Sequence, residues 1–367
     1  MGWSAMAGKQ NEKRKSAKSS EKRQEKSEKR EKSAEPAKSA KSGRSAKDAE
    51  PANGAKSGKG GKGTKSGTSG KSGKAGKAGK RSAAVAAGAP SLRELLRVTP
   101  GERPDLARLD PSATPGGPVD KAAGVAATAL LAQPLGSLQE RLYAASTAGD
   151  RRRLLLVLQG MDTSGKGGTL KHVIGLFNPS GCRIKAFKAP TEEELGHPFL
   201  WRIKQELPRP GEIGIFDRSH YEDVLIARVR ELVPRNRVRA RYAQINRFEK
   251  ALTEDGVTLV KVFLHIGHEE QRTRLLQRLD NPDKHWKFNV GDIEERTVWP
   301  AYQEAYEVAM ERCSTDEAPW YVVPANRKWY RNWAISTLLR EHLEDIDPRY
   351  PKAEFDVEEC RRRLLAG

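Results

Sequence analysis

Three residues in the middle of the chain have the types and the spacing of a phosphate-binding loop. Gly160, Gly165 and Lys166 fit the pattern G-x-x-x-x-G-K (Walker A), in which glycines let backbone N–H groups close around phosphate oxygens while the lysine neutralises their charge. The usual motif continues with a Ser or Thr that holds magnesium, but this chain has Gly167. Asp162, inside the loop, is the candidate to bind Mg²⁺ instead, because this hard cation prefers carboxylate oxygens. The expected chemistry is the binding and transfer of phosphate groups.

The loop runs into a segment of helical period, which adds further candidate phosphate ligands. Backbone N–H groups at the start of a helix point towards a bound anion, and the helix dipole favours its negative charge. A glycine turn beside a surface lysine is the alternative explanation of the pattern. The candidate phosphate-binding residues are Gly160, Thr163, Ser164, Gly165, Lys166, Gly167, Gly168, Thr169 and Lys171.

A second carboxylate follows another apolar run. Asp217 comes directly after residues 213–216, the position (Walker B) from which a P-loop enzyme's second carboxylate reaches magnesium. Asp162 and Asp217 would bind the metal together, or one would hold it while the other orients or deprotonates the attacking phosphate. Beside them, the planar guanidinium of Arg218 suits the charge that develops during transfer. For Asp217, a helix N-cap is the structural alternative.

Five cations crowd into sixteen residues further along the chain. They span a helical segment and an irregular one that contains Trp286 and Phe288. In nucleotide kinases such a stretch is a lid, which brings cations onto the transferring phosphate and excludes water. We expect this lid over about residues 270–292, and a solvated basic helix face is the alternative. The candidate lid cations are Arg272, Arg274, Arg278, Lys284 and Lys287.

Apolar runs alternate with segments of helical period along the chain, and this alternation would bring the candidate residues together. It predicts an α/β fold in which one parallel sheet is covered by helices on both faces, with the chemistry at the carboxyl ends of the strands. The expected strands are 154–158, 183–187, 211–216, 257–266 and 320–323. The expected helices are 121–148, 166 to about 178, 191–207, 221–233, 238–253, 269–279, 293–313 and 329–343.

The basic excess of the chain is concentrated in its first 90 residues. The 367 residues have a formal net charge of +19, and residues 1–90 contain 24 of the 67 Lys and Arg residues but only 8 of the 48 Asp and Glu residues. Their Lys, Ser, Gly and Ala repeats cannot bury a core, so we expect a disordered basic tail. The tail is either a solubilising segment or a tether for a polyanion, polyphosphate or nucleic acid. After the tail, we expect one domain over residues 91–350 and a C-terminal extension over 351–367.

The cysteines and the hydropathy indicate the compartment. Cys182, Cys313 and Cys360 are far apart and form no C-x-x-C pair, which predicts reduced thiols rather than disulfides or a zinc site. The longest apolar stretch outside the expected strands, residues 122–132, is too short to span a bilayer. We therefore expect a cytoplasmic protein without a membrane partner.

Three segments, taken in order, resemble the polyphosphate kinase 2 family: 160–171 (GMDTSGKGGTLK), 216–224 (FDRSHYEDV) and 281–288 (NPDKHWKF). The resemblance extends over roughly residues 92–350. It implies a thymidylate-kinase-like P-loop fold and magnesium-dependent transfer of phosphate between inorganic polyphosphate and a nucleoside mono- or diphosphate. It also implies a homo-oligomer.

The resemblance further assigns roles to individual residues. It implies that Asp162 and Asp217 are the acidic pair that binds the metal, that Lys166 and Arg218 bind phosphate, and that Arg278 is the lid arginine. These five are the candidate catalytic residues. An ATP-dependent nucleotide kinase and a P-loop module that only binds a polyanion are the alternatives.

The form of the second motif bears on the acceptor. Ser-His-Tyr-Glu-Asp is most similar to the branch that phosphorylates AMP as well as ADP, although that branch often has Asn at position 217 and Asp at position 167. Glu222, inside this motif, would help to hold the nucleotide or the metal, or would form an ion pair with Arg228.

Overall fold

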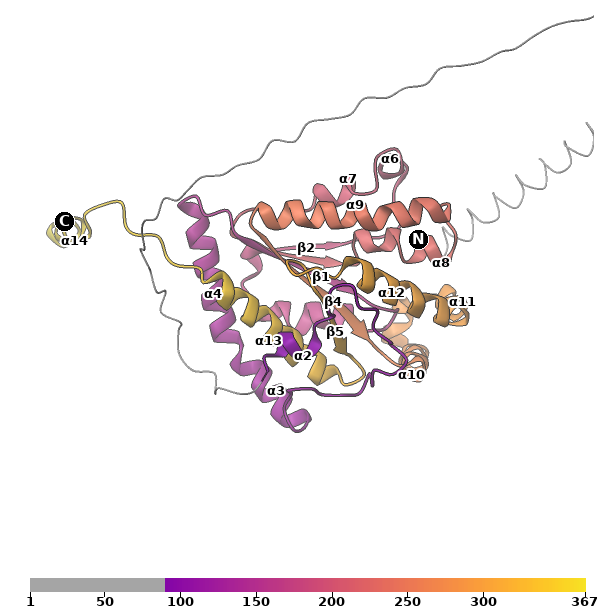
Figure 1. The fold of residues 1–367 in the computed structure, drawn as a ribbon. Coiled ribbons are helices and arrows are strands. Elements are labelled where there is room, and N and C mark those ends of the chain that lie inside the picture. The colour runs from indigo at the N-terminus through magenta and orange to yellow at the C-terminus, as the bar shows by residue number, and fades with distance from the viewer. Residues whose placement is uncertain (1–89) are drawn as a thin grey trace, which may run out of the picture. The chain divides into compact units, whose positions relative to one another are not determined.

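The computed structural model describes residues 90–367, and its centre is a parallel sheet of five strands in the order β2-β3-β1-β4-β5 (Figure 1). All five expected strands are present, within two residues of the expected bounds. The strands are β1 Arg153–Gln159, β2 Cys182–Ala186, β3 Ile213–Asp217, β4 Val257–His265 and β5 Trp320–Pro324.

The middle strands are the most apolar because they are covered on both faces. Every residue of β1 is buried, and eight of the nine residues of β4 are buried with it. β1 pairs with β3 in a register that sets Leu158 opposite Asp217, and with β4 in a register that sets Leu158 opposite Val262. The segments that leave the carboxyl ends of these strands therefore start at one edge of the sheet.

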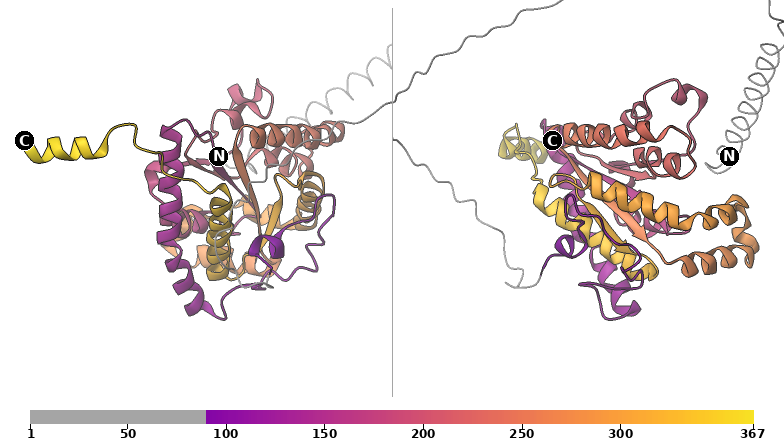
Figure 2. Two further views of the ribbon diagram at one scale, coloured as in Figure 1. Left: turned by 60° about the vertical axis from the view of Figure 1, so that its left-hand side comes forward. Right: turned by 45° about the vertical axis from the view of Figure 1, so that its right-hand side comes forward.

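Helices cover both faces of the sheet (Figures 1 and 2). α9 and α12 lie on one face, and α13, α4 and α5 lie on the other. This distribution follows from right-handed crossovers: the connection from β1 to β2 runs in one direction across the sheet, and those from β3 to β4 and from β4 to β5 run in the other. The helices are α2 Leu92–Leu96, α3 Lys121–Leu130, α4 Ala132–Thr147, α5 Lys166–His172, α6 Glu192–Leu195, α7 Trp201–Lys204, α8 Ile226–Val229, α9 Arg235–Glu254, α10 His268–Leu279, α11 Gly291–Thr297, α12 Trp299–Cys313, α13 Lys328–Ile346 and α14 Val357–Ala366.

Five of the helices expected from the sequence are divided in the structure. The segment 121–148 divides into α3 and α4 at Leu131, and the segment from 166 to about 178 divides into α5 and a 3₁₀ turn, Ile174–Leu176. The segment 191–207 begins with the expected capping box at Thr191 but breaks into α6 and α7, because Pro198 cannot continue a helix. The segment 293–313 divides into α11 and α12, with Pro300 in the first turn of α12. The segment 221–233 gives only a 3₁₀ turn, His220–Asp223, and the short α8. The helical hydrogen bonds of this segment are therefore confined to these two short turns.

The segment before α3 is an arm on the surface of the domain. The hydroxyl of Tyr330 donates to the carbonyl of Pro115, and the N–H of Asn326 donates to the carbonyl of Pro111. No helix within residues 90–367 is long and apolar enough to cross a membrane. The basic tail expected over residues 1–90 lies outside the described part of the chain, apart from its last residue.

Candidate functional site

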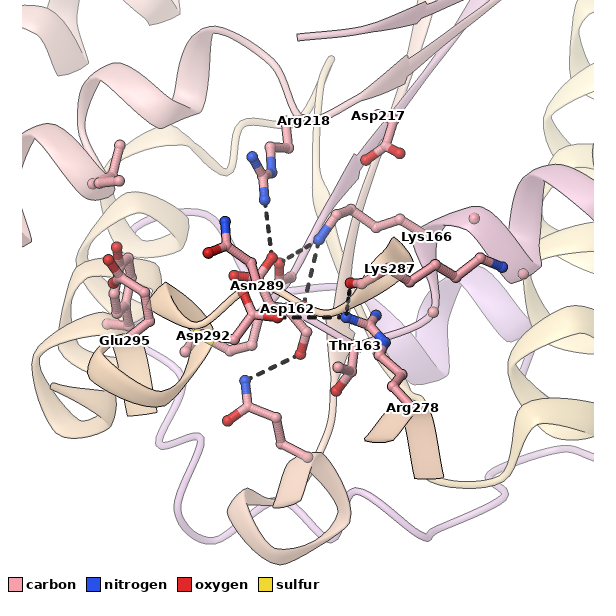
Figure 3. Close-up of a pocket in the computed structure, with 18 of the residues that line it drawn as sticks. Asp162, Thr163, Lys166, Asp217, Arg218, Arg278, Lys287, Asn289, Asp292 and Glu295 are labelled. Carbon is pink, nitrogen blue, oxygen red and sulfur yellow. Dashed lines mark hydrogen bonds and ion pairs between the residues drawn. The ribbon is translucent and has the colours of Figure 1, made fainter. Parts of the chain in front are cut away.

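A cavity of about 540 Å³ lies at the carboxyl edge of the sheet (Figure 3). Its volume is in the usual range for a small-molecule site. The loop between β1 and α5 forms one wall, the segment after β3 forms the floor, and the region from α10 to α12 forms the other wall. The lining residues are Gly160 to Thr163, Gly165 to Gly168, Asp217, Arg218, Glu222, Ile226, Gln271, Arg278, Trp286, Lys287, Asn289, Asp292, Glu295, Tyr302 and Tyr306.

The loop has the backbone shape of an anion cradle. Gly165, directly before α5, has φ 113°, and Thr163 has φ 65°, in the left-handed region that a β-branched residue seldom adopts. At Gly160 a Cβ atom would lie 2.9 Å from the carbonyl oxygen of Leu264, so only glycine fits there. The buried Nζ of Lys166 donates to the carbonyl of Gly160 at 2.8 Å, which holds the ammonium inside the loop.

Six of the nine predicted phosphate-binding residues line the cavity, and three do not. Ser164 is fully buried under the loop, and the hydroxyl of Thr169 donates to the carbonyl of Gly165. Lys171 is exposed on α5 and is absent from the cavity wall. Ser164 precedes α5 and packs under the loop, whereas the helical turn of α5 carries Thr169 and Lys171 away from the cavity.

Asp162 and Arg218 come from neighbouring strands and form an ion pair across the cavity. The Nη2 atom of Arg218 lies 2.9 Å from Oδ1 of Asp162 (Figure 3). Arg218 has φ 65°, a strained backbone conformation that the turn after β3 imposes. Burial raises the pKa of the Asp162 carboxyl, but the charges of Arg218 and Lys166 outweigh burial and hold it below its ordinary value. Asp162 is therefore a carboxylate at neutral pH.

Asp217 is the last residue of β3 and lies apart from that ion pair (Figure 3). Within residues 90–367 its carboxylate takes part in no hydrogen bond or ion pair. The structural alternative, that Asp217 caps the following turn, is wrong, because the cap is Ser219, whose Oγ accepts a hydrogen bond from the N–H of Tyr221. The Asp217 carboxylate is thus available to a ligand in the cavity.

Glu222 also faces the cavity, and the possible ion pair with Arg228 is absent. Arg228 instead lies 2.7 Å from Glu304. Glu222 is 8 % exposed, and burial raises the pKa of its carboxyl although the nearby charges of Arg218 and Lys166 oppose the rise. A third carboxyl group therefore lies beside Arg218. Its surroundings favour the protonated form, whereas the surroundings of Asp162 favour the carboxylate.

A buried polar network lies directly behind the 218–222 segment. The Nζ atom of Lys261 lies 2.6 Å from Oε2 of Glu249 and donates to the Tyr221 hydroxyl at 3.1 Å and to the carbonyl of Cys313 at 2.5 Å. Oε1 of Glu249 accepts from the Tyr221 hydroxyl at 2.8 Å and contacts Nε2 of His220 at 3.1 Å. His220 and Tyr221 are held on the core side, whereas Arg218 and Glu222, on either side of them in the chain, line the cavity.

Two of the five predicted lid cations line the cavity. The Nη1 atom of Arg278, on α10, donates to the carbonyl of Lys287 at 2.8 Å and lies 3.4 Å from Oδ2 of Asp292 (Figure 3). Burial, reinforced by the charge of Asp162, raises the pKa of Asp292 to about 6, against the opposing effect of Arg278. The side chain of Lys287 passes over the exposed ring of Trp286, with Nζ 4.7 Å from the ring centre.

The other three predicted lid cations do not line the cavity. Arg272 is exposed and pairs with Glu269, and Lys284 is also exposed. Arg274 is 6 % exposed and lies behind the phosphate loop, since positions 271, 274 and 278 form the inward stripe of α10. Its guanidinium donates to the backbone carbonyls of Thr163, Ser164, Ala325 and Asn326 at 2.8, 3.2, 2.7 and 2.9 Å.

The far wall of the cavity was missed by the sequence analysis. Tyr302 and Tyr306, spaced i, i+4 on α12, face the cavity together with Glu295, whose carboxylate pairs with Arg230 at 2.9 Å. Burial raises the pKa of both tyrosines, so their hydroxyls are neutral. Their spacing is typical of any core-facing helix, and no sequence motif distinguishes this wall from ordinary core packing.

The donor set fits a magnesium ion that shares its ligands with phosphate. Within residues 90–367, no three His, Cys, Asp or Glu side chains are grouped so as to hold a metal ion unaided. Mg²⁺ is usually bound by one or two carboxylates together with water and substrate phosphates, so such a group is not needed. Asp162 and Asp217 supply two carboxylates in one cavity beside a phosphate loop.

Comparison with known proteins gives one consistent result. Residues 119–351 match the family model described as polyphosphate kinase 2 (PPK2). The AMP/ADP-polyphosphate phosphotransferase of Meiothermus ruber is 50% identical over 258 residues, which cover 70% of this chain and 95% of that protein. The ADP-polyphosphate phosphotransferase of Rhodopseudomonas palustris is 39% identical over 247 residues, 63% of this chain and 84% of that protein. A crystal structure of polyphosphate kinase 2 from Arthrobacter aurescens superposes with a TM-score of 0.74 at 49% identity, covering 76% of this chain and 98% of that one.

Proposed function

The chain belongs to the polyphosphate kinase 2 family, and on that premise we propose that it phosphorylates both AMP and ADP from inorganic polyphosphate with the help of Mg²⁺. It is a polyphosphate–nucleotide phosphotransferase. The dependence on Mg²⁺ and the use of both AMP and ADP as acceptors are our proposals for this chain. The Meiothermus relative, which is named for both nucleotides, supports the choice of acceptors.

One observation carries the proposal: in one cavity, a loop shaped to bind an anion lies beside the Asp217 carboxylate, which makes no hydrogen bond or ion pair within residues 90–367. The loop residues and Lys166 provide positive charge on one side, and Asp217 lies on the floor within the same 540 Å³. A polyanion and a nucleotide that meet there would repel each other unless cations neutralise both. Arg218 on the floor and Arg278 in the wall supply such cations from two directions.

Asp162 and Asp217 are the residues that would hold magnesium. When bound, the ion neutralises charge on the phosphate oxygens and aligns donor and acceptor for in-line attack. Asp162 is already deprotonated through its contact with Arg218, which suits it to bind a cation. Arg218 would then be free to turn towards the acceptor phosphate.

The remaining side chains bind and orient the phosphates. Backbone N–H groups of the loop and the ammonium of Lys166 hold the terminal phosphates of the donor, and Arg218 stabilises the charge that develops on the transferring group. Arg278 approaches from the predicted lid, where its hydrogen bond to the carbonyl of Lys287 already points it into the cavity. Closure of that segment would exclude water, so that phosphate reaches the nucleotide rather than water.

Three further expectations remain predictions. A cytoplasmic location suits reduced cysteines and nucleotide substrates. A homo-oligomer is expected from the family resemblance. Binding of polyphosphate or nucleic acid by the basic residues 1–90 is separable from turnover, because the phosphate loop and the carboxylates lie within residues 90–367.

The test is a coupled assay in which AMP or ADP is offered with long-chain polyphosphate or with ATP as donor, with and without Mg²⁺. We expect ADP and ATP to appear from polyphosphate only when Mg²⁺ is present. Transfer from ATP alone would identify a conventional nucleotide kinase. Formation of ATP from ADP, with no product from AMP, would restrict the acceptor to the diphosphate.

A further inference from the structure

Arg331, on α13, packs its guanidinium against the back of the phosphate loop. The residue is 3 % exposed. A Cβ atom added at Gly165 would lie 1.7 Å from Nη1 of Arg331, and one added at Gly168 would lie 2.7 Å from Nη2. The guanidinium therefore occupies the space that side chains at these two positions would need. Both glycines line the cavity on their other side.

The charge of Arg331 has no counter-ion in the described part of the chain. Within residues 90–367, its guanidinium donates hydrogen bonds to a single neutral acceptor, Oδ1 of the adjacent Asn332, at 3.2 and 2.8 Å. No carboxylate within residues 90–367 lies within ion-pair distance of it. Burial, together with the nearby charge of Arg274, lowers the pKa of Arg331 to about 10, so the group is still cationic at neutral pH.

Each of the other buried arginines within residues 90–367 has a carboxylate partner. Arg153 pairs with Asp255 at 2.5 Å. Arg202 lies 3.4 Å from Glu194, and Arg274 lies 2.7 Å from Glu270. A buried charge without a partner destabilises a fold, so ordinary packing does not account for an arginine at position 331.

The position of Arg331 indicates the missing partner. Its guanidinium packs against the loop at Gly165 and Gly168, and both glycines line the cavity in which the donor would bind. We propose that Arg331 is a positioning residue whose charge is compensated by the polyphosphate donor bound on the other face of the loop. This inference rests on the proposed function, because it places the donor at the loop. It also explains why positions 165 and 168 are glycines, since a side chain at either would displace the guanidinium.

The proposal predicts that replacing Arg331 changes the stability of the protein and its affinity for the donor in opposite directions. Replacing Arg331 by methionine removes an uncompensated charge and keeps most of the side-chain volume, so the ligand-free protein should be as stable as wild type or more stable. The same change removes positive charge from behind the loop, so the donor should bind more weakly. A residue that only packs α13 against the loop would give the reverse pattern, with lower stability and unchanged donor affinity.

The experiment uses the full chain with Mg²⁺ and compares wild type with Arg331→Met and Arg331→Lys. Thermal unfolding is measured alone and with inorganic tripolyphosphate, and steady-state kinetics are measured with ADP and long-chain polyphosphate. For Arg331→Met we expect an unchanged or higher Tm without ligand, a smaller rise with tripolyphosphate, and a KM for polyphosphate about tenfold higher, equivalent to about 1.4 kcal/mol. The KM for ADP should stay near wild type. Arg331→Lys keeps the charge, so its KM for polyphosphate should lie between the values of wild type and Arg331→Met.

Arg340→Met is the matched control. Arg340 lies on the same helix, about 13 Å further along its axis, and pairs with Glu344 at 3.6 Å. Its substitution should leave both KM values unchanged. An Arg331→Met protein that fails to fold, or that keeps the wild-type KM for polyphosphate, overturns the proposal for Arg331 while the proposed function stands. If wild type itself transfers nothing from polyphosphate, the proposed function fails and the role of Arg331 fails with it.

Discussion

Replacing Lys261 by methionine should destabilise the protein far more than removing any exposed lysine. The Lys261 ammonium is fully buried, and its loss leaves the Glu249 carboxylate, 2 % exposed, without its cation. Burial raises the pKa of Glu249, but Lys261 and His220 outweigh burial and hold it below its ordinary value. The carboxylate is therefore charged in the native protein and loses its main compensation in the variant.

These contacts set the loss of unfolding free energy that we expect for Lys261→Met. Removing one partner of a buried ion pair costs about 3–5 kcal/mol, because an uncompensated charge remains. For a domain of this size that corresponds to a fall in Tm of roughly 6–20 °C. Replacing both partners, as in Glu249→Leu/Lys261→Met, leaves no buried charge, and such replacements are often close to neutral. The double variant should therefore recover most of the lost stability.

Activity should not recover with stability. The pair anchors His220 and Tyr221, which set the direction of Arg218 and Glu222, and it bonds the end of α12, the helix that carries Tyr302 and Tyr306 into the cavity. We expect a reduced kcat in the folded double variant, because small displacements of these groups are costly for transfer.

The assays are urea unfolding and thermal unfolding of both single variants and the double variant, followed by transfer kinetics below their transition temperatures. Lys250→Met is the control, because Lys250 lies next to Glu249 on α9 and its exposed partner is Glu254, so the change should stay within about 0.5 kcal/mol. A loss of less than 1 kcal/mol in Lys261→Met would refute the reasoning. Recovery of full kcat in the double variant would show that the pair stabilises the core without positioning the site.

Further changes test other parts of the site. Asp217→Asn should lower kcat by about 10²–10³-fold in the transfer assay with little change in Tm, and near-normal turnover would leave Asp217 with no catalytic role. Arg274→Ala leaves several buried backbone carbonyls without donors and should cost about 3 kcal/mol in urea unfolding; a loss below 1 kcal/mol would contradict that account. The raised pKa of Asp292 means that the folded protein binds the extra proton, so the stability contribution of this group falls as pH rises from about 4 to about 6. Asp292→Asn should flatten that part of a plot of Tm against pH, and an unchanged profile would exclude Asp292 as its source. Removal of Mg²⁺ with EDTA should abolish transfer from polyphosphate, and added Mg²⁺ should restore it.

The strain in the site is consistent with its proposed chemistry. Thr163 and Arg218 both have positive φ although neither is glycine, and both line the cavity. Such conformations cost about 1–3 kcal/mol each and persist where the surrounding contacts fix them. Around Thr163 these contacts include the hydrogen bond from Arg274 to its carbonyl, and at Arg218 they include the ion pair to Asp162. These contacts therefore fix the conformation of the loop and of the turn after β3 without any ligand.

The sequence by itself determined the parts of this protein whose cause is local. The strands are predictable because a parallel strand buried on both faces needs a continuous apolar run, and the phosphate loop because its glycines and lysine must follow such a run at fixed spacing. Asp162 and Asp217 could be assigned to one cavity for the same reason, since each leaves the carboxyl end of a neighbouring strand. Helix boundaries were less certain, because a proline can begin one helix or end another depending on where the chain must turn.

Only the tertiary structure decided which charged side chains face the ligand. The inward stripe of α10 can be read from its period, but the sequence does not say that position 274 meets backbone carbonyls while position 278 meets the cavity. Arg331, Tyr302 and Tyr306 lie more than a hundred residues from the phosphate loop in sequence and belong to helices with ordinary core-facing patterns. Helical periodicity fixes which residues share a face, whereas packing across the sheet fixes what that face meets. The groups that surround the phosphate site from behind and from the far wall therefore became visible only in the folded chain.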